Sequence, residues 1–238
     1  MSHNLETTED NENTGSGIKW LLLLLLMIVI AAATFYLFGT NAPATEPVEV
    51  ATEKTAKVEI PAETVTVVSG SVDTSGNYIY DLGKIISIEL PNGAGTLKVG
   101  ENSTESRLFK FLSDPGEKID TVKGNWFEFT NVRFVTGGAK IDSASASQLI
   151  NVVALSKGFP AASFKLGGYT DNTGDSVANI ALSQKRSEAV LASLKKLGIS
   201  SKALTGAKGY GPQFPIGDNS TALGKAMNRR VAINVKSK

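Results

Sequence analysis

Two oppositely charged residues stand out in the stretch 167–190, whose pattern predicts a strand, a turn and a helix. Asp171 lies at the turn and Arg186 lies in the helix that follows. With about 100° per residue on a helical wheel, Arg186 falls inside a mostly apolar sector. That sector consists of Leu182, Ala189, Val190, Ser193 and Leu197. A carboxylate and a guanidinium held in this way can pair with each other or bind the opposite charges of a ligand.

The cost of burying a charge is compatible with a structural ion pair and with a ligand-binding site. A buried charge needs a partner, so Asp171 and Arg186 could form a structural ion pair. Alternatively, the two groups are held apart and bind a zwitterionic ligand, since arginine offers a planar fork to a carboxylate. Asn179 lies two turns before Arg186 on almost the same side of the helix, and this second polar group favours the ligand. The residues alone do not decide between the two.

The composition of the chain excludes several classes of function. The 24 basic and 23 acidic residues nearly balance, which argues against nucleic-acid binding. There is no cysteine, and the one histidine, His3, lies in a polar acidic leader. Thiol chemistry, a Ser-His-Asp triad and a histidine-based zinc site are therefore excluded. The only acidic neighbour of Asp171 is Asp175, on the same turn, so we expect neither an enzyme nor a cofactor or metal site.

A long apolar run near the N-terminus predicts a membrane anchor. From Trp20 to Phe38 no charged residue occurs, and a helix of this length spans a bilayer core of about 30 Å. A cleaved signal peptide is the alternative, but its apolar region usually has only about 7–15 residues. We expect a polar leader at 1–17 and a transmembrane helix at 18–39. A span without charges is typical of an anchor rather than an ion pathway.

Two further segments are expected before the C-terminal domain. The stretch 40–63 is rich in Pro, Ala, Thr and Glu and predicts a flexible spacer. Short β-type runs separated by turn sequences then predict a small, mostly antiparallel β module at 64–121. These runs are VTVVSG, YIYDLG, KIISIEL, TLKVG and RLFKFL. Glu101, Glu105 and Arg107 are interpreted as a solvated face of this module.

The region 122–238 alternates strand and helix patterns, which predicts an α/β (α+β) fold with helices on one face of a mixed sheet. Strands are expected at 126–134, 162–171, 202–211 and 229–235, and helices at 145–159, 178–197 and 221–229. Gly198 is expected to end the long helix.

Four motifs in this region, in order, resemble those of the OmpA-like C-terminal domain, a peptidoglycan-binding fold. They are Gly168-Tyr169-Thr170-Asp171, Asn179-x-x-Leu182-Ser183-x-x-Arg186, Gly209-Tyr210-Gly211 and Asn228-Arg229-Arg230-Val231. The resemblance runs from about residue 126 to 235. The family often carries His before Thr-Asp, where this chain has Tyr169. The fold implied is a βαβαβ-type sandwich.

The resemblance implies a ligand for the two charges. Asp171 would take the ammonium and Arg186 the carboxylate of the stem-peptide diamino acid, usually meso-diaminopimelate. Thr170 and Asn179 would be supporting hydrogen-bond groups. Of Arg229 and Arg230, one is expected to point into the polar network of the sheet and the other to solvent.

The anchor and the wall-binding domain together imply a tether between the cytoplasmic membrane and peptidoglycan. The domain would then lie in the periplasm and the leader in the cytoplasm. A stator-like or sensor component of a larger envelope complex is the alternative, with the same wall-binding domain.

Overall fold

The structure is a computed structural model that describes residues 69–238. Their elements are, in order, β1 (Gly70–Val72), β2 (Tyr78–Tyr80), β3 (Ile85–Glu89), β4 (Thr96–Gly100), α2 (Thr104–Ser113), β5 (Asn125–Glu128), η1 (Ser143–Ser145), α3 (Ala146–Gly158), β6 (Ser163–Tyr169), α4 (Ser176–Lys196), η2 (Ser201–Ala203), β7 (Leu204–Gly211), α5 (Ala222–Asn228) and β8 (Val231–Ser237). Within this range, no helix has the length and apolarity that a bilayer crossing requires. The predicted leader, transmembrane helix and spacer (1–17, 18–39 and 40–63) lie outside the described residues.

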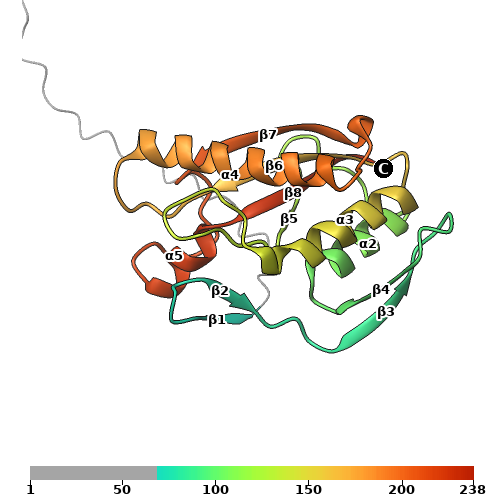
Figure 1. Ribbon diagram of the computed structural model, residues 1–238, viewed down its shortest axis with the longest axis horizontal. Coiled ribbons are helices and arrows are strands. Elements are labelled where there is room, and N and C mark those ends of the chain that lie inside the picture. The colour runs from blue at the N-terminus through green and yellow to red at the C-terminus, as the bar shows by residue number, and fades with distance from the viewer. Residues whose placement is uncertain (1–68) are drawn as a thin grey trace, which may run out of the picture. The chain divides into compact units, whose positions relative to one another are not determined.

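A four-stranded mixed sheet forms the centre of the fold (Figure 1). Its strand order is β5-β8-β6-β7, with β6 and β7 parallel and the other two pairs antiparallel. Residues alternate between the two faces, so Val231, Ile233 and Val235 on β8 point into the core. The predicted order of strands and helices and the mixed sheet are confirmed.

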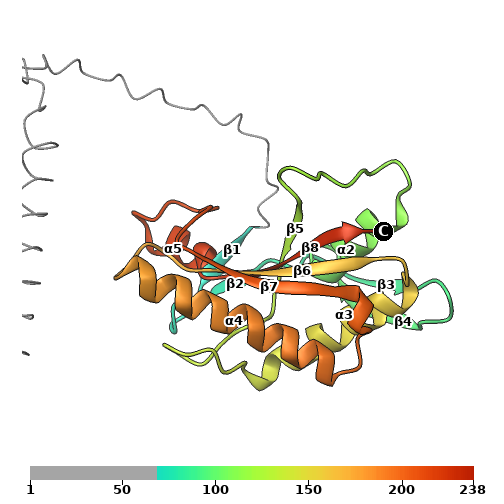
Figure 2. The same ribbon diagram turned by 90° about the horizontal axis from the view of Figure 1, so that it is seen from above.

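Helices α3 and α4 cover one face of this sheet (Figure 2). Helix α4 is capped by Asp175, whose side chain accepts a hydrogen bond from the backbone N–H of Ala178. It ends before Gly198, which has a φ of 90° as the sequence predicts for a helix terminator. The short helix α5 lies beside β1 and β2 instead.

The segment RLFKFL is a helix, so the prediction of a strand there was wrong. Helix α2 is capped by Ser103, which accepts a hydrogen bond from the N–H of Ser106. Leu108, Phe111 and Leu112 follow at helical spacing and are all buried. The alternation of large apolar residues in RLFKFL therefore masks an i, i+3, i+4 pattern. The strands in the described part of 64–121 form two antiparallel hairpins, β1–β2 and β3–β4.

One hydrophobic core joins this N-terminal part to the sheet. It contains Ile88 and Val99 of the second hairpin, Leu108 of α2, and Leu166 and Ile233 of the sheet. The boundary expected between 64–121 and 122–238 therefore divides residues that share a core, and residues 69–238 belong to one compact unit.

Glu105 is buried and does not belong to a solvated face, contrary to expectation. Its carboxylate accepts hydrogen bonds from Gln148 (2.8 Å) and Asn151 (3.0 Å) of α3. Arg107 pairs with Glu128 of β5 at 3.2 Å. These polar contacts join α2 to α3 and β5, and a buried carboxylate without them would be strongly destabilising.

Helix α4 lies unusually close to the sheet because small residues meet at the contact. An added methyl group at Gly168 of β6 would overlap the carbonyl of Ser183, and one at Gly209 of β7 would overlap the backbone of Gln184. Ser183 Oγ donates to the carbonyl of Ile180 (2.9 Å) and accepts from the N–H of Gly211 (2.9 Å). The hydroxyl is therefore satisfied although it is buried.

This contact shifts the buried face of α4 away from the sector predicted by hydrophobicity. The buried residues of α4 are Ser183, Ser187, Val190 and Leu194. Leu197, which the wheel placed in the apolar sector, is 39% exposed. Arg186 consequently lies at the edge of the buried face rather than in its middle. Ser183 and Ser187 lie outside the sector predicted from hydrophobicity, yet at this interface they are small enough for close packing.

We predict that Gly168→Ala lowers the free energy of unfolding by about 1–3 kcal/mol, because the methyl group must push α4 off the sheet. Urea unfolding of the full-length chain measures this change. The matched control is Gly138→Ala, where an added methyl group meets nothing closer than 3.5 Å. Equal stability of the two variants would show that the α4 contact is not tight.

Candidate functional site

The turn after β6 is held by hydrogen bonds from the residues that the sequence singled out. Thr170 Oγ1 donates to the carbonyl of Asp171 (2.8 Å), and its backbone N–H donates to the carbonyl of Gly211 on β7 (2.9 Å). Asn179 Nδ2, in the first turn of α4, donates to the carbonyl of Thr173 (2.9 Å). Thr170 and Asn179 thus stabilise the backbone of the turn, and neither lines the pocket described below.

Asp171 is only 8% exposed, and its carboxylate accepts hydrogen bonds from Thr173 and Arg229. Oδ1 accepts from the backbone N–H of Thr173 (2.9 Å), and Oδ2 forms an ion pair with Nη1 of Arg229. Burial alone would raise the pKa of Asp171, but these two contacts outweigh it and hold the pKa below its usual range. The carboxylate is therefore ionised at neutral pH.

Arg186 is not the partner of Asp171. Its Nε donates to the carbonyl of Gly138 (2.9 Å), and its guanidinium lies 5.3 Å from the ring centre of Phe134. Burial is the main cause that lowers the pKa of Arg186, and nearby Arg229 adds to it, whereas Asp171 opposes the shift. No acidic group within residues 69–238 lies within 4.0 Å of this guanidinium. The predicted pair is thus close enough to interact electrostatically but is not joined.

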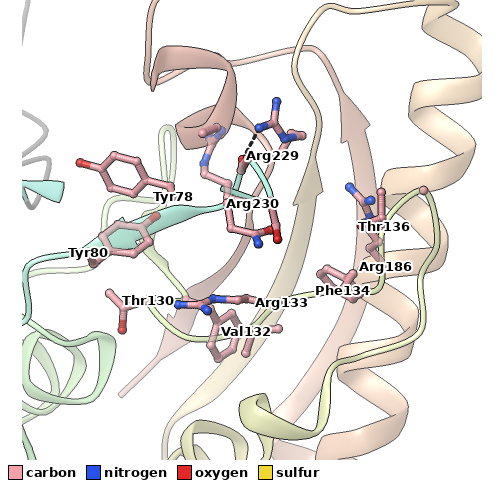
Figure 3. A pocket seen from close by; sticks show the side chains of 16 residues that line it. Tyr78, Tyr80, Thr130, Val132, Arg133, Phe134, Thr136, Arg186, Arg229 and Arg230 are labelled. Carbon is pink, nitrogen blue, oxygen red and sulfur yellow. Dashed lines mark hydrogen bonds between the residues drawn. The ribbon is translucent and has the colours of Figure 1, made fainter. Parts of the chain in front are cut away.

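A pocket of about 140 Å³ lies beside this arrangement (Figure 3). Tyr78 and Tyr80 of β2 stand at one side of it, and Phe134 and Arg186 at the other. Its lining residues come from the β1–β2 hairpin, the segment 129–137, α4 and the region around α5. They are Ser75, Gly76, Asn77, Tyr78, Tyr80, Phe129, Thr130, Val132, Arg133, Phe134, Thr136, Gly137, Arg186, Ala226, Arg229 and Arg230.

Four of these lining residues are arginines and none is acidic. Asp171 does not line the pocket, whereas its ion-pair partner Arg229 does line it. The interior of the pocket is therefore strongly positive although the whole chain carries a formal net charge of only +1. Such a concave, basic surface favours small anions with carboxylate or similar groups.

Arg229 and Arg230 both line the pocket but have different surroundings. The side chain of Arg229 is 35% exposed, and besides Asp171 it contacts the carbonyl of Gly76 in the hairpin. The guanidinium of Arg230 stacks 3.8 Å from the ring centre of Tyr169 on the sheet and donates to the carbonyl of Phe214 (3.0 Å). Arg230 is thus the inward member of the pair, and Arg229 is the more exposed one.

Sequence reasoning missed the contribution of the hairpin and of Arg133. Tyr78 and Tyr80 reach the pocket only because residues 70–80 fold back against α5, a long-range contact that no local pattern encodes. Arg133 sits in a stretch that was predicted to be a continuous strand. In the structure β5 ends at Glu128, and the following segment bends into the pocket wall. The described residues contain no cluster of ligands suited to a metal ion.

Comparison with known proteins identifies relatives of the C-terminal part. Residues 133–229 match the model of the OmpA family. The chain is 39% identical over 105 residues to "Probable lipoprotein YiaD" of Escherichia coli K12, covering 44% of this chain and 48% of that protein. It is 36% identical over 123 residues to "Peptidoglycan-binding protein ArfA" of Mycobacterium tuberculosis H37Rv, covering 52% of this chain and 36% of that protein.

Among solved structures, the chain is similar to the peptidoglycan-associated lipoprotein of Burkholderia pseudomallei. The identity is 27% and the TM-score is 0.41, with 44% of this chain and 89% of that chain covered. The chain spans about half or less of the length of the curated relatives named above.

The pKa of Asp171 predicts a specific pH dependence of stability. Because the folded-state pKa is lowered, the charge stabilises the fold above the unfolded pKa of about 3.9, and this contribution is lost as pH falls through the folded value. Asp171→Asn should therefore be less stable than the parent at pH 7, and the difference should shrink by pH 3. Urea unfolding of the full-length chain at both pH values measures it.

Asp175→Asn is the matched control for this comparison, because it lies on the same turn and Asn is an equally good N-cap residue. It should stay close to the parent at both pH values. A difference between Asp171→Asn and the parent that is the same at pH 7 and pH 3 would contradict the assignment of the ion pair.

Proposed function

We infer that this chain, whose residues 133–229 form a domain of the OmpA family, binds peptidoglycan non-covalently through Asp171 and Arg186. The ligand is the diamino acid of the stem peptide. One observation carries the proposal: Arg186 faces a basic pocket without an acidic partner among the described residues, close to the turn that holds Asp171. The name of the ArfA relative, a peptidoglycan-binding protein, supports the same class of ligand.

Arg186 supplies the carboxylate-binding half of this site. Only its Nε is engaged by a described residue, the carbonyl of Gly138, and this contact fixes the plane of the guanidinium. Nη1 and Nη2 then remain to donate to a ligand carboxylate, which gives short, charge-assisted hydrogen bonds. Phe134 packs against the guanidinium and limits its motion. A pre-positioned side chain loses little conformational entropy on binding.

Asp171 supplies the ammonium-binding half. Its Oδ1 accepts from the backbone N–H of Thr173 and its Oδ2 from Arg229, and an ionised carboxylate can accept about four hydrogen bonds. A ligand ammonium can therefore share Asp171 with Arg229. It can also displace Arg229, whose side chain is partly exposed and has the hairpin carbonyl of Gly76 as another partner. The pair Asp171–Arg229 keeps the carboxylate ionised until the ligand arrives.

We propose binding without catalysis. The sequence offers no cysteine and a single histidine, at position 3, so common nucleophile–base pairs are not available. The arginines of the pocket match a mechanism in which opposite charges are recognised and no bond is broken. The wall is a polymer with many copies of the ligand, so each weak contact gains from multivalency.

If residues 18–39 form a transmembrane helix, the protein tethers the cytoplasmic membrane to peptidoglycan. We propose that 18–39 anchor the chain in the cytoplasmic membrane, that 40–63 form a spacer and that the C-terminal domain lies in the periplasm. The leader 1–17 is then cytoplasmic. The spacer sets the reach of the domain and hence its effective concentration at the wall.

We predict that Asp171→Ala and Arg186→Ala abolish co-sedimentation of the full-length protein with purified peptidoglycan while leaving the fold intact. Each variant removes one of the two charges that the zwitterion needs. Arg186→Lys should restore little binding, because lysine keeps the charge but lacks the bidentate fork. Circular dichroism of the same samples checks the fold.

Lys185→Ala is the control for these variants, since it removes a neighbouring exposed charge on α4 that does not line the pocket. It should sediment like the parent. Full binding by both Asp171→Ala and Arg186→Ala would refute the site, whatever their stability.

The proposed topology predicts the result of proteolysis. Protease added to intact spheroplasts should digest the C-terminal domain or the 40–63 segment and spare an epitope tag placed in the leader, because the membrane shields only the cytoplasmic side. Immunoblotting of both ends measures this. Protection of the C-terminal domain in intact spheroplasts, with digestion after lysis, would place it in the cytoplasm.

A further inference from the structure

The face of the sheet opposite α4 carries aromatic side chains that do not belong to the pocket. Gly168 of β6 lies against α4, and side chains on a strand alternate between the two faces, so Gly167 and Tyr169 point the other way. A methyl group added at Gly167 would overlap the ring of Trp126 on β5, so this indole covers β6 at that point. Helices α3 and α4 lie on the opposite side of the sheet (Figure 2).

Four rings form this outer aromatic cluster, namely Trp126, Tyr169, Tyr210 and Phe214. Tyr169 and Tyr210 stack with 5.2 Å between their centroids. Trp126 and Phe214 stand edge-on to Tyr210, at 5.9 Å and 5.7 Å. Trp126 and Tyr210 are half-buried and Phe214 is 64% exposed. The rings therefore hold one another in place and present aromatic surface to solvent.

Phe214 has an unfavourable backbone conformation for its type. Its φ is 57°, in the left-handed region that a bulky residue rarely adopts. The loop is held there because the carbonyl of Phe214 accepts a hydrogen bond from Nη2 of Arg230 (3.0 Å). A structural role would normally bury such a ring, yet this ring is mostly exposed. Backbone outliers of this kind cluster at ligand-binding sites, so Phe214 points to a ligand on this face.

Two lysines add hydrogen-bond donors to the outer aromatic cluster. Nζ of Lys208 lies 5.2 Å and Nζ of Lys165 lies 5.9 Å from the ring centre of Tyr210. No acidic group among residues 69–238 lies within 4.0 Å of either ammonium group. Each ammonium has three donors. The surface therefore suits a ligand with apolar C–H faces for the rings and with acceptor oxygens for the lysines.

The outer aromatic cluster begins where the pocket ends. Arg230 lines the pocket, and its guanidinium lies 3.8 Å from the ring centre of Tyr169. Tyr169 in turn stacks on Tyr210. A polymer held in the pocket by a side branch would therefore meet these rings with the part of its backbone next to that branch.

We propose that Trp126, Tyr210 and Phe214, with Lys165 and Lys208, form a separate site for the glycan strand, a polymer of N-acetylated amino sugars. The C–H groups of a sugar ring pack on the aromatic faces, and its hydroxyl and acetamido oxygens accept hydrogen bonds from the lysines. The choice of this polymer rests on the proposed function. A single-stranded nucleic acid also stacks on aromatic rings, but a formal net charge of +1 gives little attraction for a chain of phosphates.

Chitohexaose, a soluble oligomer of N-acetylglucosamine, tests this site separately from the pocket, because it has neither a carboxylate nor an ammonium group. Isothermal titration of the full-length chain, in a detergent whose head group is not a sugar, should show binding. Arg186→Ala should bind chitohexaose as the parent does, although it should no longer sediment with peptidoglycan.

The two proposals fail separately in this experiment. No binding of chitohexaose by the parent would overturn the glycan site and leave the pocket untouched. Sedimentation of Arg186→Ala with peptidoglycan like the parent, together with binding of chitohexaose, would support the glycan site and contradict the pocket. Tighter binding of a short oligothymidine than of chitohexaose would overturn the glycan assignment in favour of nucleic acid.

Variants locate the site on the sheet. Phe214→Asn should weaken chitohexaose binding by about two- to tenfold, the range of one aromatic contact. Asn adopts a positive φ more readily than Phe, so urea unfolding should show no loss of stability. Lys208→Gln should weaken binding by about two- to fivefold. Ile150→Gln, which changes a 52% exposed apolar residue of α3, is the control and should bind like the parent. Parent-like affinity of both Phe214→Asn and Lys208→Gln would show that this face is not the glycan site.

Discussion

The close contact between α4 and the two parallel strands is the constraint on which the site depends. Gly168 and Gly209 leave no room for a side chain, so the backbone of α4 at Ser183 and Gln184 lies directly on β6 and β7. Gln184 adds to this by accepting a hydrogen bond from the N–H of Gly209 (2.6 Å). Arg186 follows within one turn of the helix. Its position relative to the turn after β6 is therefore fixed by backbone packing and does not depend on flexible side chains.

The arginines of the pocket differ in the groups that stabilise their charges. Arg229 neutralises Asp171, which would otherwise be a buried anion, and no acidic group among residues 69–238 lies within 4.0 Å of Arg186. Arg230 stacks on Tyr169, an arrangement in which a guanidinium is partly stabilised by the ring face. Arg186, Arg229 and Arg230 are thus each held by a neutral or shared contact. The fold tolerates an excess of positive charge in the pocket because carbonyl groups and aromatic rings, rather than acids, hold most of it.

The sequence predicts most of the C-terminal fold because its strands and helices have clear periods and caps. It also singles out Asp171 and Arg186 as candidate binding residues, since a charge in an unexpected place is visible locally, and this assignment stays a prediction. It fails for α2, where the alternation in RLFKFL conceals a helical period, and for the buried face of α4, where serines pack as small residues. The pocket wall formed by Tyr80 and Arg133 depends on contacts between segments about 50 residues apart. Such contacts leave no mark on the local pattern of either segment.

The position of the β1–β2 hairpin has a mechanical consequence. Any pulling force on the chain before residue 69 enters the described fold at β1, whose first residue, Gly70, pairs with Tyr80 at the open end of the hairpin. Because the hydrogen bonds of an antiparallel pair lie perpendicular to the strands, strands pulled apart from their open end separate one pair at a time. The backbone hydrogen bond between Asp81 and Ser69 would break first, and the pair Gly70–Tyr80 would separate next. Tension on an anchored chain would therefore reach a wall of the pocket before it reached the core. It would change the affinity for a ligand without unfolding the domain.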